Sequence, residues 1–295
     1  MLSLLIKDLS AVDTQNYLQH AIGPRPICFA STIDANGNVN LSPFSFYNLF
    51  STNPAIIVFS PSRRVRDNTT KHSLQNILEV PEVVVNTVTY DLLQQVSLTS
   101  CEFPKGTDEF IKAGLTKEPS VLVKPPRVKE SLVQFECKVL EVKSLGNDGG
   151  AGNLVIAEII LMHINDGILN EKGFIDQHKL DLVARLGGNW YTRANSSTIF
   201  EVDKPNTLLG IGVDQLPGNI RNSKILSGND LGRLANVHFM PDIDASFEDE
   251  KLKNIFQYYS TDPVEMETEL HIYAKELLKQ ERVADAWQVL LAISY

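Results

Sequence analysis

Residues suited to binding a phosphate stand together at Lys71, His72 and Ser73, directly after a pair of threonines. The residues through Leu78 have the composition of a helix. The first turn of a helix presents free N–H groups and the positive end of its dipole. Lysine, protonated histidine and hydroxyl side chains add charge-assisted hydrogen bonds to such a site. An ordinary surface helix capped by Thr70 has the same residues, so this cluster alone leaves both interpretations open.

A second stretch, Asn40–Asn48, combines aromatic rings with hydroxyl and amide side chains. A buried strand favours valine and isoleucine instead, and a solvent loop does not concentrate Phe44, Phe46 and Tyr47. The mixture suits the wall of a site that holds a flat ligand with polar edges. Packing of the three rings in the protein core is the alternative.

Arg25, Ser31 and Thr32 become candidates through a predicted hairpin. Residues 27–33 form its first strand, and an Asn-Gly pair follows that allows positive φ in the turn. The return strand starts at Val39 and runs into the aromatic stretch. Ser31 and Thr32 then lie opposite the start of the return strand. One face therefore gathers an arginine, hydroxyls, amides and rings.

The remaining pattern predicts the elements that position these candidates. Residues 25–164 contain about six strands with short connections and only two or three helices, which favours an antiparallel barrel or sandwich over a doubly wound parallel sheet. From residue 246 onward the chain is helical. We expect strands at 27–33, 39 onward, 55–60, 82–88, 131–143 and 154–164, and helices at 13–21, 71–78, 90–97, 108–113, 176–186, 247–259, 263–279 and 282–294.

Composition narrows the classes of function. The net charge of −9 disfavours nucleic acid as a partner, because binding its backbone requires clustered lysine and arginine. No apolar run is long enough to span a bilayer, and the start of the chain lacks the features of a signal peptide. Three widely spaced cysteines fit reduced thiols. We therefore expect a cytoplasmic protein without a membrane partner.

Two further sequence patterns predict neither a phosphate-binding loop nor a metal site. The glycine-rich link at 146–153 lacks the strand-to-helix context of a phosphate loop and is expected to be a hairpin loop. Glu265, Glu267 and Glu269 near His271 are scattered around a helix by their spacing, so no metal site is predicted.

Taken in order, several segments resemble the flavin reductase-like family, whose fold is the FMN-binding split β-barrel and which includes flavoredoxin. The similarity spans about residues 20–195. Its segments are Gly23–Ile27, Ser31–Asp34, Asn40–Asn48, Lys71–Ile77, Thr99-Ser100, Phe103-Pro104, Asp108–Phe110, Ala113–Leu115, Lys124–Arg127, Glu136–Lys138, Leu182–Gly188 and Tyr191. The resemblance implies a mainly β protein, an antiparallel split β-barrel with flanking helices at 1–202. Residues 203–295 form a C-terminal extension, loop-rich and then α-helical.

The resemblance also implies bound FMN. Residues 44–48 are expected to contact its ring and ribityl chain, largely through the backbone, with Ser31 and Thr32 near the ribityl chain or phosphate. The family more often has Lys-Asp-Thr where this chain has Lys71-His72-Ser73, so the hydroxyl is retained and a histidine replaces a carboxylate. The cofactor-binding residues that we predict are Arg25, Ser31, Thr32, Ser45, Phe46, Tyr47, Asn48, Lys71, His72, Ser73, Asn76 and Arg185.

Family members are usually homodimers with the flavin near the subunit interface, so a homodimer is expected here. The implied function is an FMN-dependent oxidoreductase, which moves electrons from a nicotinamide nucleotide or a redox-protein donor through FMN to flavin or another acceptor. Hydride transfer from a nicotinamide requires no acid–base side chain, so no catalytic residue is predicted. The alternative is a non-catalytic flavin carrier or redox sensor whose helical tail docks a partner.

Overall fold

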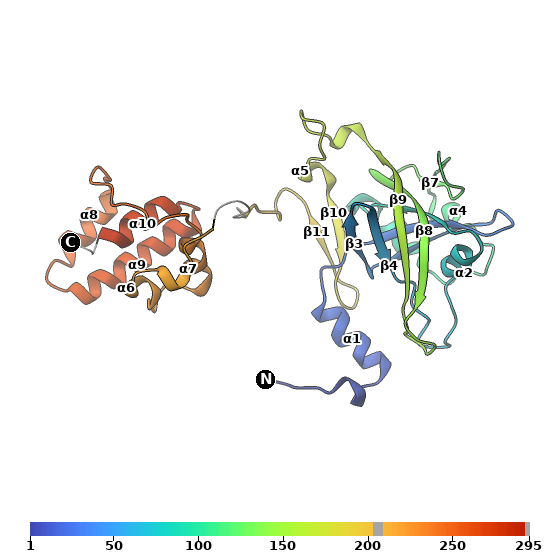
Figure 1. The fold of residues 1–295 in the computed structure, drawn as a ribbon, viewed down its shortest axis with the longest axis horizontal. Coiled ribbons are helices and arrows are strands. Elements are labelled where there is room, and N and C mark those ends of the chain that lie inside the picture. Colours follow the sequence, from blue (N-terminus) through green and yellow to red (C-terminus); the bar gives the residue numbers. More distant parts are fainter. Residues whose placement is uncertain (203–208, 293–295) are drawn as a thin grey trace. The chain divides into compact units, whose positions relative to one another are not determined.

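The computed structural model describes residues 1–202 and 209–292, and the chain divides into two compact units, Met1–Phe200 and Glu201–Tyr295 (Figure 1). Each unit has a hydrophobic core of its own. None of the helices in the described ranges combines the length and apolar character that crossing a lipid bilayer requires.

The first unit is built around a seven-stranded antiparallel sheet with the strand order β2-β1-β5-β8-β9-β4-β3. The long β8–β9 hairpin, green in Figure 1, lies within the sheet, and β2 and β3 form its edges. The strands of the sheet are β1 (Cys28–Ile33), β2 (Val39–Phe44), β3 (Tyr47–Thr52), β4 (Ala55–Phe59), β5 (Glu82–Asn86), β8 (Val133–Ser144) and β9 (Asn153–Ile164). Two small hairpins pair β6 (Lys117–Glu118) with β7 (Arg127–Val128) and β10 (Leu182–Arg185) with β11 (Tyr191–Ala194).

The first unit also contains short helices, some of which pack on the sheet. They are η1 (Ile6–Asp8), α1 (Ala11–Ala21), α2 (His72–Glu79), η2 (Tyr90–Leu92), α3 (Leu93–Leu98), α4 (Glu109–Ala113), η3 (Asp166–Ile168) and α5 (Gln177–Leu180). Because neighbouring residues of a strand point to opposite faces, β1 contributes to two cores. Cys28 packs in the cluster that contains Ile77 of α2, and Phe29 packs in the cluster that contains Phe110 of α4.

The predicted hairpin of β1 and β2 is confirmed. Ser31 lies opposite Leu41 and Thr32 lies opposite Asn40. The Asn-Gly turn contains Gly37 with a φ of 88°, a backbone conformation that glycine adopts without strain. The hairpin therefore brings the hydroxyls and the polar end of the aromatic stretch together, as the sequence indicated.

The aromatic stretch Asn40–Asn48 is not a single return strand. β2 ends at Phe44 and β3 begins at Tyr47, so the chain reverses at Ser45 and Phe46 and pairs next with β4. The sequence prediction of about six strands missed this edge strand, because Ser45, one of the weaker turn formers, is the single turn residue at the reversal and no glycine or Asn-Gly pair marks it.

Three helix predictions need correction. The predicted helix at 176–186 is only the four-residue α5, because Asp181 adopts a left-handed conformation and the next residues form β10. Helix α1 begins at Ala11, before the predicted start at 13, and Ser10 caps it, since the Ser10 hydroxyl accepts a hydrogen bond from the Asp13 N–H at 3.0 Å. Thr70 does not cap α2. Lys71 occupies the cap position and no side chain accepts from the first turn.

The second unit is α-helical, as predicted. Its helices are η4 (Val213–Gln215), α6 (Gly218–Arg221), α7 (Gly228–Ala235), α8 (Glu250–Tyr258), α9 (Pro263–Lys279) and α10 (Val283–Leu291). Trp287 of α10 is fully buried in the core, and its indole N–H donates to the Leu234 carbonyl at 3.2 Å. The predicted end of the last helix, at Ser294, lies outside the described residues.

His271 of α9 is buried and has a constrained protonation state. The Ser223 hydroxyl oxygen accepts from the N–H groups of Ile225 and Leu226, both at 3.1 Å, and lies 2.8 Å from His271 Nδ1. Because the Ser223 oxygen already accepts two hydrogen bonds, its hydroxyl donates its own proton to His271 Nδ1. His271 Nε2 is buried without a partner. Burial lowers the pKa of His271, although Glu267 opposes this shift.

The second unit should therefore lose stability as the pH falls below about 6.5, the ordinary pKa of an unfolded histidine. The folded state has the lower pKa, so the unfolded state takes up the proton first and unfolding becomes easier in acid. Thermal melts of the full chain at pH 7.5 and 5.5 should show an acid loss in the α-helical transition. His271→Leu should reduce that loss, whereas His238→Leu, at an exposed site, should leave it unchanged. An equal acid loss in all three proteins would contradict this account.

Candidate functional site

A small polar pocket lies at the N-terminus of α2. Its volume is about 20 Å³, which leaves room for about one water molecule. Strand β2, helix α2, the loop before it and the segment between α3 and α4 all contribute to it. The lining residues are Asn40, Ser42, Arg64, Lys71, His72, Ser73, Thr99, Ser100, Cys101, Glu102, Phe103 and Glu109.

Lys71 and His72 bring basic groups to this pocket. Both side chains are half-buried, and among the described residues Lys71 forms no salt bridge. Burial, assisted by the charge of Arg64, lowers the pKa of Lys71. The same two causes lower the pKa of His72, so its ring is mostly neutral at pH 7. Lys71 is then the charged group, and His72 offers a neutral donor or acceptor.

Buried hydrogen bonds attach α2 to the β1–β2 hairpin. The Asn40 side-chain amide donates to the Ser73 hydroxyl at 2.9 Å, and the Asn76 amide donates to the Thr32 hydroxyl at 3.2 Å. Thr32 and Asn76 therefore lie beneath the polar pocket and support it without lining it. Ser31 points to the opposite face of β1, where its hydroxyl is buried without a partner.

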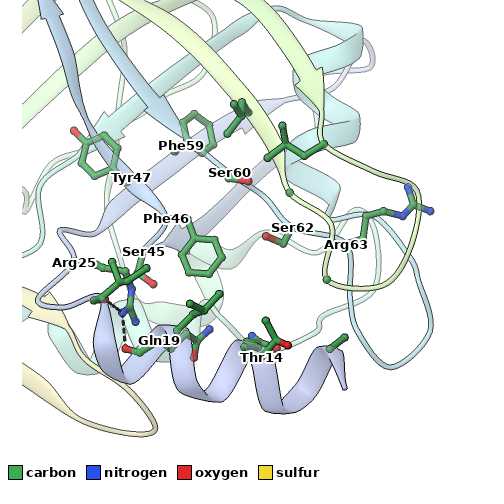
Figure 2. Close-up of a pocket in the computed structure, with 18 of the residues that line it drawn as sticks. Thr14, Gln19, Arg25, Ser45, Phe46, Tyr47, Phe59, Ser60, Ser62 and Arg63 are labelled. Carbon is green, nitrogen blue, oxygen red and sulfur yellow. Dashed lines mark hydrogen bonds between the residues drawn. The ribbon is translucent and has the colours of Figure 1, made fainter. Parts of the chain in front are cut away.

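A much larger pocket, with a volume of about 940 Å³, lies between α1 and the sheet (Figure 2). Ser45, Phe46, Tyr47 and Asn48 line it, as does Arg25. Figure 2 shows the Phe46 ring inside it, above α1. Burial raises the pKa of Tyr47, so its phenol stays protonated. The other lining residues are Ile6, Lys7, Leu9, Ala11, Thr14, Gln15, Leu18, Gln19, Ile22, Pro24, Pro26, Phe50, Val58, Phe59, Ser60, Ser62, Arg63, Val65, Leu145, Gly149, Gly150, Gly152 and Leu154.

Arg25 is largely occupied by the protein itself. Its Nη1 donates to the carbonyls of Gln19, at 2.7 Å, and Ile22, which closes the C-terminal end of α1 (Figure 2). Its Nη2 donates to the Leu186 carbonyl at 2.9 Å, and its buried Nε has no hydrogen-bond partner among the described residues. The guanidinium lies 6.0 Å from the centre of the Phe46 ring. Arg25 therefore orients this wall of the large pocket.

Arg185 lines neither pocket. Its backbone pairs with that of Arg25 through two hydrogen bonds of 2.8 and 2.9 Å. The side chain donates to the Gly188 carbonyl at 2.6 Å and lies 4.5 Å from the centre of the Tyr191 ring. Gly187-Gly188, which follows the predicted helix at 176–186, lies in the turn between β10 and β11.

The structure splits the predicted set of residues between the two pockets. Lys71, His72 and Ser73 line the polar pocket, and Ser45–Asn48 with Arg25 line the large one. The two are close along the chain: Ser42 lines the polar pocket and Ser45 the large one, and three residues span about 10 Å at most.

Sequence reasoning missed Arg64 and Glu102, which both line the polar pocket. The basic run at 63–66 was a visible signal for Arg64, but nothing near Glu102 indicated its place. The contributions of α1 to the large pocket, such as Thr14 and Gln19, had no sequence signal.

The predicted absence of a metal site concerned the acidic residues near His271. Within the described part of the chain, no group of three or more His, Cys, Asp and Glu side chains could hold a metal ion.

Comparison with known proteins assigns the chain to a family. The model of the flavin reductase-like domain matches residues 22–181, so the chain belongs to the flavin reductase-like family. An uncharacterized protein of Aquifex aeolicus is 39% identical over 171 residues, which are 58% of this chain and 85% of that protein. The second unit lies beyond the matched residues.

Solved structures agree with this assignment. The chain resembles nitrilotriacetate monooxygenase component B from Bacillus cereus with a TM-score of 0.64 and 28% identity, over 68% of this chain and 98% of that one. It also resembles a proposed flavin reductase with a split barrel domain from Shewanella frigidimarina, with a TM-score of 0.57 and 26% identity, over 67% and 96%. The first unit is therefore a split barrel, and the protein is a flavin-related oxidoreductase.

The glycine-rich loop 146–153 connects β8 to β9, as predicted, and holds the segment that carries Arg64. A Cβ atom on Gly149 would lie 2.9 Å from the Val65 carbonyl oxygen and 3.1 Å from that of Arg64. Gly150 N–H donates to the Arg63 carbonyl at 3.1 Å, and Arg63 N–H donates to the Ala151 carbonyl at 2.9 Å. The close approach of the two backbones requires glycine at 149.

Gly149→Ala should therefore loosen the segment that carries Arg64. The added methyl group forces the two backbones apart, and we expect a loss of roughly 1–3 kcal/mol in the free energy of unfolding. Chemical denaturation measures the loss, and limited proteolysis within 63–70 should become faster. Gly232→Ala, a helical site with open space around it, is the control. Equal stability of Gly149→Ala and the wild type would rule out this role for the contact.

Proposed function

We propose that the protein is an FMN-dependent oxidoreductase that takes electrons from a nicotinamide nucleotide or a small redox protein and passes them to flavin or another acceptor. One observation carries the proposal. Lys71 is a half-buried cation at the uncapped N-terminus of α2, without a salt bridge among the described residues. A cation so placed favours a phosphate, because the first-turn N–H groups of the helix add to its charge.

The residues present fit FMN. Lys71, His72 and Ser73 would hold the phosphate in the polar pocket, and the backbone of Ser45–Asn48 would hold the ring in the large pocket. A volume of about 940 Å³ falls within the range of about 300–1,000 Å³ that is usual for ligand pockets. Ser42 and Ser45 lie no more than about 10 Å apart, so one elongated ligand can reach from the polar pocket into the large pocket.

The side chains of this site bind and orient, and none is assigned as an acid or base. Bound FMN supplies a ring that accepts and releases electrons, alone or with a hydride. Phe46 and Tyr47 give the large pocket an aromatic wall. Tyr47 stays protonated because burial raises its pKa, so it offers a hydrogen-bond donor and no negative charge. Backbone N–H groups beside the ring would favour negative charge on it.

Replacement of Lys71 tests the phosphate contact. Lys71→Met should weaken FMN binding by roughly tenfold to a hundredfold, the usual range for losing a hydrogen bond to a charged group. Riboflavin, which lacks the phosphate, should bind both proteins equally. Flavin fluorescence titrations measure both affinities, and Lys138→Met, at an exposed position of β8, is the control. Wild-type protein that is colourless after incubation with FMN and removal of the free flavin would exclude the proposed function.

A turnover assay distinguishes an oxidoreductase from a non-catalytic flavin carrier. Under anaerobic conditions NADH or NADPH should bleach the bound flavin, and added free flavin or another acceptor should restore its absorbance. The second unit, Glu201–Tyr295, lies outside the matched family residues and has its own core, which favours the alternative of a flavin carrier that docks a partner. Tight FMN binding with neither nucleotide oxidised would support that alternative.

Two copies of the chain form the working unit in this proposal. Helix α1 buries no residue within its own chain although Val12, Tyr17 and Leu18 are apolar or aromatic and exposed. The edge strand β3 exposes Leu49 and Phe50 in the same unit. Apolar surface of this extent supports an interface with a second copy.

Phe50→Asp should therefore convert a dimer into a monomer, because it places a charge in the apolar interface. Size-exclusion chromatography with light scattering gives the mass directly. Phe239→Asp in the second unit is the control and should leave the dimer intact. Its ring is similarly exposed, with Phe239 at 74% and Phe50 at 67%. A monomeric wild type at all concentrations would refute the dimer.

A further inference from the structure

A carboxylate lines the pocket in which the proposed function places a phosphate. Glu102 Oε1 accepts from Arg64 Nε at 3.1 Å, and Oε2 accepts from Arg66 Nη2 at 2.8 Å. The hydrogen bond from Arg66, followed by the charges of Arg66 and Arg64, lowers the pKa of Glu102. The side chain is therefore an anion at neutral pH. Lys71 shares the pocket and feels this charge.

Of the two arginines that bind Glu102, Arg64 is held in place by the protein, whereas the Arg66 side chain is 71% exposed. Arg64 Nη1 donates to Thr69 Oγ1 at 2.8 Å and to the Thr70 carbonyl at 2.9 Å, and only 16% of the Arg64 side chain is exposed. The Glu102 side chain is 46% exposed. It belongs to the segment between α3 and α4, which forms no strand or helix. An exposed loop side chain moves at low cost.

The other carboxylate of the pocket is held differently. Glu109 Oε2 accepts from the Leu41 N–H of β2 at 3.0 Å, and burial raises the pKa of Glu109. It is therefore fixed in place by this backbone contact. Among the described residues that line the pocket, Glu102 is the carboxylate that can swing outward.

The volume of the pocket requires such a movement. About 20 Å³ admits one water molecule but not a phosphate. We propose that Glu102 occupies the anion site as an internal competitor, and that it must release Arg64 before a phosphate can enter. This inference rests on the proposed function, because it concerns how the same pocket selects its ligand. A doubly charged phosphate competes with a carboxylate, and a singly charged carboxylate or halide does not.

Removal of the competing charge should strengthen phosphate binding. Glu102→Gln keeps the shape of the side chain, and it should bind FMN about fivefold or more tightly than the wild type. The affinity for riboflavin should stay the same. Fluorescence titrations give both dissociation constants. Glu118→Gln is the matched control, because Glu118 is a similarly half-exposed carboxylate, 38% exposed and 3.8 Å from Arg127, that lines neither pocket.

Inorganic phosphate is the second probe. Thermal shift should show that phosphate stabilises Glu102→Gln more than the wild type or Glu118→Gln, and that acetate at equal ionic strength stabilises none of them. Equal or weaker binding of FMN and phosphate by Glu102→Gln would overturn the role of Glu102, even when the wild type binds FMN. A wild type that binds no flavin would overturn the proposed function. In that case the phosphate measurement still decides whether Glu102 competes for the anion site.

Discussion

Two buried amide-to-hydroxyl hydrogen bonds determine where the polar pocket lies. Asn40 donates to Ser73 at 2.9 Å, and Asn76 donates to Thr32 at 3.2 Å. All four side chains are buried, so leaving any of these groups unpaired would cost free energy. The two bonds attach the first two turns of α2 to the β1–β2 hairpin. The N-terminus of the helix is therefore fixed over one face of the sheet, and Lys71 is fixed with it.

The large pocket depends on a different constraint. Arg25 uses its two Nη atoms on carbonyls of α1 and of the β10–β11 turn, which hold two peripheral elements against the start of β1. The backbone bridge from Arg25 to Arg185 reinforces this connection. An arginine that the sequence suggested as a ligand contact thus shapes the pocket by holding its walls, and α1 becomes one of those walls.

Sequence reasoning worked best where the structure is local. The Asn-Gly turn predicted the β1–β2 register correctly, since the turn type determines which residues face each other. The predicted start of α9 at residue 263 agrees with the structure, where Asp262 caps the helix and Pro263 takes the first helical position. These signals require only a few neighbouring residues.

The errors arose where distant contacts decide the structure. Leu182–Arg185 continues an apolar pattern that suits a helix, yet backbone bonds to Arg25 and Thr89 draw it into a strand. The place of Glu102 beside Arg64 depends on two loops 38 residues apart in sequence. The division of the site into a polar and a large pocket likewise follows from how β2 and β3 part at Ser45 and Phe46, where no glycine or Asn-Gly pair marks the reversal.

The contact between Gly149 and the backbone at 64–65 also limits how the protein can change over evolutionary time. Gly149 lies more than 80 residues away along the chain from the segment it touches, and it contributes no side chain to any chemistry. Drift at 149 toward any residue with a Cβ must nevertheless displace the segment that carries Arg64. A descendant that keeps the polar pocket must therefore keep glycine at 149, because only a residue without a Cβ fits against this segment.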